Sequence, residues 1–86
     1  MKFKLPRHVS LTAVDDDAVL LDLNSGAYFG LNHIGASLLD QLQQGISAEL
    51  AIENIAKQYQ ISNDIVAQDI QELLSELIDQ ALIEPI

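Results

Sequence analysis

The stretch that decides the fold is "LLDLNSGAYFGLNHIG", residues 20–35. It contains an apolar strand, an Asn-Ser-Gly turn and a second strand of about five residues, and this order predicts a β-hairpin. The second strand carries two of the four aromatic residues in the chain, Tyr28 and Phe29, beside Gly30. Gly30 would let a foreign backbone approach this strand closely, with the aromatic side chains acting as platforms or as core plugs.

The residues before this hairpin predict a further strand. In "HVSLTAV", residues 8–14, apolar and polar side chains alternate as they do in a half-buried strand. The three aspartates at 15–17 cannot easily pair in a sheet, so they predict a hairpin loop. Strands at 8–14, 18–23 and 27–31 with such short connections predict an antiparallel meander.

From residue 32 onward the spacing of apolar residues becomes helical. Three helices are expected, at about 33–43, 48–59 and 63–82. Each follows a residue that can cap a helix N-terminus: Asn32, Ser47 and Ser62. The fold class is therefore α+β, a three-stranded antiparallel sheet followed by three helices. The helices must cover one face of the sheet, because otherwise their apolar stripes would lie in water.

The third predicted helix is more apolar than a surface helix needs to be. Its apolar side chains spread over about 180° of the helix, whereas a stripe of about 100° is usual. The sheet and the other helices could bury the whole arc. Alternatively, the Val66–Ile70–Leu73–Leu77 edge forms one wall of an open apolar groove, with strand 27–31 as the second wall. An extended peptide could then add to that strand, provided that it lies at the edge of the sheet.

The composition of the chain limits the classes of function that it can have. Eighty-six residues predict one domain spanning residues 1–86, and the absence of cysteine excludes disulfides and thiolate chemistry. Thirteen acidic and four basic residues give a net charge of −9, which disfavours nucleic-acid binding. The acidic surface serves solubility or attracts a basic partner. No apolar run approaches a membrane span and no signal peptide is evident, so a cytoplasmic protein without membrane association is expected.

No catalytic motif is recognisable. His8 and His33 are the only histidines, no serine lies in a nucleophile elbow, and residues 15–17 lack the spacing of a calcium loop. No enzyme activity, cofactor or metal site is therefore expected. An acyl carrier protein would need a serine at a helix start, whereas Ser37 lies inside a helix. A winged-helix DNA-binding module would need basic residues on its recognition helix, and the third helix has none.

The segments "LDLNSGAYFGLN", "QGISAELAIENIAKQYQI" and "DIQELLSELIDQALI", with Gly35 opening the first helix, resemble the PqqD-like family over about residues 8–83. These RiPP recognition elements bind the leader peptides of ribosomally made, modified peptides, and the family fold is a winged helix-turn-helix. The stand-alone form of the domain and its segment "SGAYFGLN" are most similar to the recognition protein of lasso-peptide biosynthesis. That protein works beside a leader peptidase and a cyclase.

The resemblance implies that a leader adds as a strand against residues 27–31 and packs under the third helix. Eleven contact residues are implied: Ala27, Tyr28, Phe29, Gly30, Leu31, Val66, Asp69, Ile70, Leu73, Leu74 and Leu77. Asp69 would pair with a leader Lys or Arg. The expected function is a non-catalytic adaptor that presents the leader to a peptidase and to modifying enzymes.

Two alternatives stay open. Ser37-Leu38-Leu39 stands where many relatives carry a bulkier aromatic residue, so a peptide chaperone for a radical-SAM maturation pathway is the first. The second is a winged-helix interaction or dimerisation module outside peptide modification. An exposed edge strand would also support a homodimer.

Overall fold

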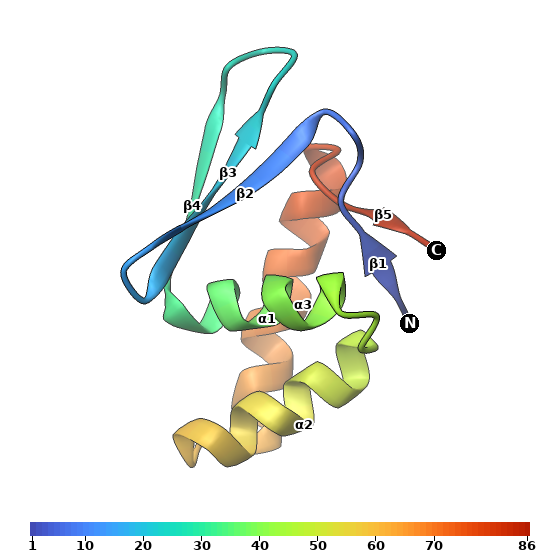
Figure 1. Cartoon of the computed structure of the whole chain (residues 1–86). Coiled ribbons are helices and arrows are strands. Elements are labelled where there is room, and N and C mark those ends of the chain that lie inside the picture. Colours follow the sequence, from blue (N-terminus) through green and yellow to red (C-terminus); the bar gives the residue numbers. More distant parts are fainter.

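The computed structural model describes all 86 residues and confirms the α+β architecture (Figure 1). The five strands are β1 (Phe3–Lys4), β2 (Val9–Val14), β3 (Asp17–Asp22), β4 (Tyr28–Leu31) and β5 (Glu84–Pro85). The three helices are α1 (His33–Gln43), α2 (Ala48–Tyr59) and α3 (Asn63–Asp79). None of these helices is long and apolar enough to cross a membrane.

Strands β2, β3 and β4 form the predicted antiparallel meander, in that order. Each observed strand agrees with its predicted range to within one residue at either end. The prediction that all of residues 15–17 form a loop was wrong for Asp17, which begins β3 and pairs with Val14. The connection can be shorter because Asp15 adopts a φ of 55°, a left-handed conformation that a short polar side chain tolerates.

The sheet has one covered and one open face. Ala18, Leu20 and Leu31 point to the covered face and are buried, and α1 packs across that face. Tyr28 points the other way, and 75% of its surface is exposed. The expectation that helices cover one face of the sheet is therefore confirmed for α1, whereas α2 and α3 pack mainly on other helices.

Side-chain caps begin all three helices at the predicted residues, Asn32, Ser47 and Ser62. The Asn32 side chain accepts hydrogen bonds from the N–H groups of Ile34 and Gly35, at 3.1 and 3.0 Å. Because Asn32 is the only residue between β4 and α1, this cap holds the first turn of α1 directly beside the end of β4.

The predicted end of the third helix, at about residue 82, was wrong: α3 ends at Asp79. Ala81 takes a φ of 57°, and the Leu82 N–H donates to the Leu77 carbonyl oxygen at 2.9 Å. This turn redirects the chain so that Leu82 and Ile83 are buried in the core. The chain then pairs β5 with β1 in a second, two-stranded antiparallel sheet, which the sequence did not predict (Figure 1).

Candidate peptide-binding site

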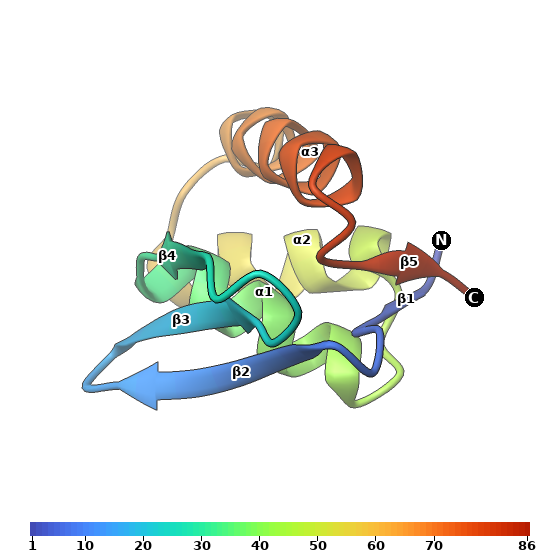
Figure 2. The same ribbon diagram turned by 90° about the horizontal axis from the view of Figure 1, so that it is seen from above.

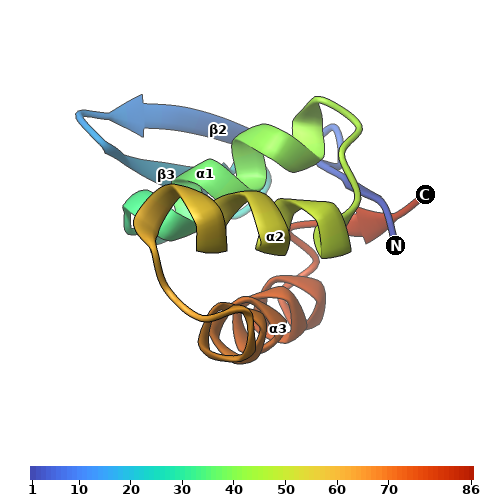
Figure 3. The same ribbon diagram turned by 90° about the horizontal axis from the view of Figure 1, so that it is seen from below.

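Strand β4 lies at an edge of the sheet, next to α3. Viewed from above, the elements follow one another in the order β2, β3, β4 and α3 (Figure 2). Helix α3 packs chiefly against α2 and α1 rather than against β4. The view from below shows α3 beside α2 (Figure 3). An unpaired strand edge therefore faces a helix without being covered by it.

The main-chain groups at this edge can be assigned from the hydrogen-bonding pattern. The Asp22 N–H donates to the Ala27 carbonyl oxygen at 2.9 Å, in register with the β3–β4 pairing. In an antiparallel ladder, residues alternate between facing the partner strand and facing away from it. The N–H and C=O groups of Tyr28 and Gly30 consequently point to the open edge, where no strand pairs with them.

A groove of about 390 Å³ separates β4 from α3, and we call it the leader groove after the peptide that the resemblance leads us to expect there. Its lining combines apolar side chains with three carboxylates on α3. The lining residues are Phe29, Gly30, Leu31, Asn32, Ile34, Gly35, Asp69, Ile70, Glu72, Leu73 and Glu76. The arrangement offers main-chain pairing along one wall and both apolar and acidic contacts along the other.

The structure brings six of the eleven expected contact residues together in this groove: Phe29, Gly30, Leu31, Asp69, Ile70 and Leu73. Ala27 and Tyr28 lie just before them on the same stretch of chain and are exposed. Val66, Leu74 and Leu77 do not line the groove and are buried in the core. The wide apolar arc of α3 thus divides between a buried side and a groove edge at Leu73.

Five groove residues were not anticipated: Asn32, Ile34, Gly35, Glu72 and Glu76. The two glutamates follow Asp69 at helical spacing, a signal that the sequence did contain. Gly35 has a steric role that the sequence did not reveal.

A Cβ atom on Gly35 would lie 3.2 Å from a methyl group of Leu31 and 3.3 Å from one of Leu73. Because glycine has no side chain, the methyl groups of both leucines have room beside the helix at the floor of the groove. Gly30 has open space around it instead, because an added Cβ atom would meet nothing within 4 Å.

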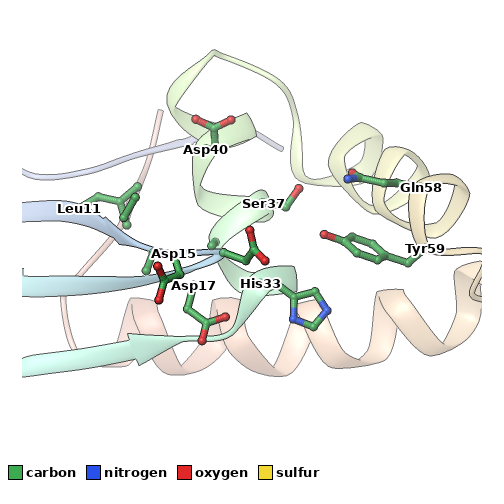
Figure 4. Close-up of a pocket in the computed structure, with 12 residues that line it drawn as sticks. Leu11, Asp15, Asp17, His33, Ser37, Asp40, Gln58 and Tyr59 are labelled. Atoms are coloured by element: carbon green, nitrogen blue, oxygen red, sulfur yellow. The ribbon is translucent and has the colours of Figure 1, made fainter.

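A second cavity, which we call the turn pocket, lies beside the β2–β3 turn (Figure 4). It is larger, about 620 Å³, and four aspartates line it: Asp15, Asp16, Asp17 and Asp40. The rings of His33 and Tyr59 meet edge to face there, with centroids 5.3 Å apart. No group of three or more His, Asp or Glu side chains in the molecule could hold a metal ion. Side chains of α1 and α2 line the turn pocket together with Leu11 and Ala13 of β2.

Comparison with known proteins identifies the family of the chain. The family model described as coenzyme PQQ synthesis protein D (PqqD) matches residues 17–83. A structure of TbiB1 in complex with the TbiA(beta) leader peptide is 30% identical. That match covers 100% of this chain and 98% of the other, with a TM-score of 0.86.

A structure of lasso peptide synthetase B1 complexed with the leader peptide is 27% identical. It covers 99% of this chain and 100% of the other chain, with a TM-score of 0.87. No match was found among curated protein sequences. The family model covers most of the chain, and both similar structures extend over nearly all of it. The chain therefore belongs to the PqqD family.

Proposed function

We propose that the protein binds the leader segment of a ribosomally synthesised precursor peptide in the leader groove, without catalysing a reaction itself. The observation that carries this proposal is the unpaired edge of β4 facing α3 across a partly apolar groove. The two similar structures support it, because each is a complex with a leader peptide.

The binding mode follows from the two walls of the groove. The outward main-chain groups of Tyr28 and Gly30 would pair with an extended peptide and fix its register. Alternate side chains of such a strand point to the same side, so every second leader residue would reach Leu31, Ile70 and Leu73. Main-chain pairing supplies affinity for any extended chain, and the side-chain contacts select among sequences.

The biological role proposed is that of an adaptor in the cytoplasm. Holding the leader raises the effective concentration of the precursor at a leader peptidase and at a cyclase or other modifying enzyme. The lasso-peptide pathway is favoured over a radical-SAM pathway, because both similar structures are complexes with leader peptides and one is described as a lasso peptide synthetase. The same edge of β4 could instead pair with a second copy of the chain.

An NMR titration of labelled protein with the leader of the precursor encoded beside its gene tests the proposal. Saturable shifts are expected at residues 27–31 and at the groove side of α3. A dilution series without peptide separates leader binding from self-pairing, which would shift the same residues as concentration rises.

Leu73→Asp is the matching variant, because it places a charge against the apolar part of the groove. Leu11→Asp is its control, since Leu11 is also half-buried but lines the turn pocket. Only Leu73→Asp should weaken leader binding, by about 10-fold or more, as burial of an unpaired charge costs well over 1.4 kcal/mol. The proposed groove is wrong if folded Leu73→Asp protein binds the leader at wild-type strength.

A further inference from the structure

The wall of the leader groove that α3 forms carries three acidic side chains, Asp69, Glu72 and Glu76. Resting on the proposed function, we propose that the groove selects leader segments that carry lysine or arginine on the side facing α3. The resemblance already implies such a pairing at Asp69, and Glu72 and Glu76 extend it to a row of cations.

The three carboxylates share one side of α3. Asp69, Glu72 and Glu76 follow one another at intervals of three and four residues, which places them along the same helical face. All three line the groove together with the apolar Ile70 and Leu73. A peptide strand lying against β4 would therefore meet a row of negative charge alongside its apolar contacts.

The protein itself provides no cation for this row. The structure contains two ion pairs, between the Met1 ammonium and Glu49 and between Lys4 and Glu84. Neither involves a groove carboxylate, and none of the four basic residues of the chain lines the groove. Like charges at neighbouring helical positions repel one another, so a bound cation would relieve this repulsion.

The spacing indicates which basic residues would fit. Glu72 and Glu76 lie about 6 Å apart along the helix axis, at a rise of about 1.5 Å per residue. Side chains on one face of an extended strand repeat at about 6.8 Å. Two basic residues separated by a single position would therefore reach both glutamates, with Asp69 near the next position on that face.

The expected effect is moderate, because all three carboxylates are exposed. A single exposed ion pair changes an equilibrium constant by about 1.5- to 5-fold. Three pairs together should give about 10-fold tighter binding of a basic than of a neutral peptide at low salt. This preference should decline towards 1 M salt, where charges are screened within about 3 Å.

The test uses a phage-displayed library of random twelve-residue peptides and three forms of the protein. The first is the wild type, and the second is the groove variant Asp69→Asn/Glu72→Gln/Glu76→Gln. The third, the control variant Asp15→Asn/Asp16→Asn/Glu53→Gln, loses the same charge from exposed residues outside the groove. One enriched peptide and its Lys/Arg→Gln version are then compared by fluorescence anisotropy at low and high salt.

The wild type and the control variant are expected to enrich peptides with basic residues two positions apart. The groove variant should lose this preference while still binding apolar extended peptides. The inference is overturned if all three proteins enrich the same sequences, or if the two variants lose the preference equally, since net charge alone would then explain it. Failure of the wild type to enrich any sequence or to bind the leader would instead overturn the proposed function.

Discussion

The two edge strands of the sheet, β2 and β4, differ in what lies beyond them. Beyond β4 stands α3, which lines the leader groove (Figure 2). Beside β2, side chains of α1 and α2 line the turn pocket together with Leu11 and Ala13. Both edges present unpaired main-chain groups. Just after β3, the Leu23 N–H donates to the His8 carbonyl oxygen at 2.7 Å, which fixes the alternation along β2. By this alternation the N–H and C=O groups of Ala13 point outward.

The comparison separates two requirements of peptide recognition. An open edge supplies hydrogen-bonding groups that any extended chain can use, so it carries no sequence preference. A facing helix adds side-chain contacts and restricts which peptides fit. Volume alone does not identify the peptide site, since the turn pocket is larger than the leader groove but lies at the β2–β3 turn and is lined by four aspartates.

The largest expected effect comes from placing proline at equivalent positions on the two edges. Gly30→Pro removes an outward N–H from β4, and Ala13→Pro removes one from β2. Proline is tolerated on edge strands when its missing N–H faces away from the partner strand, so both variants should fold. Gly30→Pro should weaken leader binding by about 100-fold, since an unsatisfied group in a buried ladder costs about 1–3 kcal/mol and the ring obstructs the peptide.

Ala13→Pro should leave leader affinity unchanged, as measured by isothermal titration calorimetry on both proteins. Equal losses for the two variants would show that the peptide uses either edge, and the distinction between them would fail. Circular dichroism spectra of the free proteins would exclude unfolding as the cause.

A smaller effect is expected from filling the floor of the groove. Gly35→Ala would place a methyl group 3.2 Å from Leu31 and 3.3 Å from Leu73, so one of these side chains must shift. The strain of about 1 kcal/mol or more is opposed by the better helix propensity of alanine, about 1 kcal/mol. The free energy of unfolding should therefore change by less than about 1 kcal/mol, while leader affinity falls about 2- to 5-fold.

Gly30→Ala is the informative counterpart of this change. Its added Cβ meets no atom of the free protein within 4 Å, so any loss of affinity would report contact with the peptide itself. Chemical denaturation and calorimetry on both variants separate the two causes. An unchanged affinity for Gly35→Ala would mean that the leader does not reach the floor of the groove.

The smallest expected effect distinguishes the two hairpin turns by pH. The N–H of Asn24 donates to the Asp22 carboxylate at 2.9 Å and, with a longer bond from Ser25, lowers the pKa of Asp22 below its ordinary value of 3.8. A lowered pKa means that these bonds stabilise the β3–β4 turn above that value and are lost as the pH falls below it. No main-chain N–H donates to an aspartate side chain in the β2–β3 turn, at Asp15 and Asp16.

Amide chemical shifts recorded from pH 5 to pH 2 check this difference. The Asn24 and Ser25 amides should move together as Asp22 titrates, and Asp22→Asn should remove their common response. The responses of the Asp15 and Asp16 amides should be the same in the wild type and in Asp22→Asn. A response of Asn24 that persists in the variant would assign it to another group.

Sequence patterns predicted the regular elements of this fold because their signals are local. Asn32, Ser47 and Ser62 were identified as caps from their position before helical runs, and each accepts the expected hydrogen bond. Strands β1 and β5 escaped prediction because two residues carry no periodic pattern. The sequence did not predict the early end of α3, because this end depends on the burial of Leu82 and Ile83 in the core. Helix propensity contains no information on such tertiary contacts.

The groove was predicted in outline for a different reason. The width of the apolar arc on α3 showed that some apolar surface was in excess, but not which residues the core would take. Leu77 and Val66 belong to the buried side, and Leu73 belongs to the groove. The contribution of Gly35 depends on contacts with Leu31 and Leu73, which lie far apart in sequence, so no local pattern could reveal it.

The pairing of β1 with β5 has a consequence for the order of folding. Phe3 pairs with Pro85, so this contact closes a loop of nearly the whole chain. Closing a loop of about 80 residues costs about 4 kcal/mol of chain entropy beyond a constant. The cost becomes small only after the helices have brought the two segments together, so this strand pair should form last and open first in hydrogen exchange. Since it lies on the side of the molecule away from β4 in Figures 1 and 2, its opening would leave the leader groove intact.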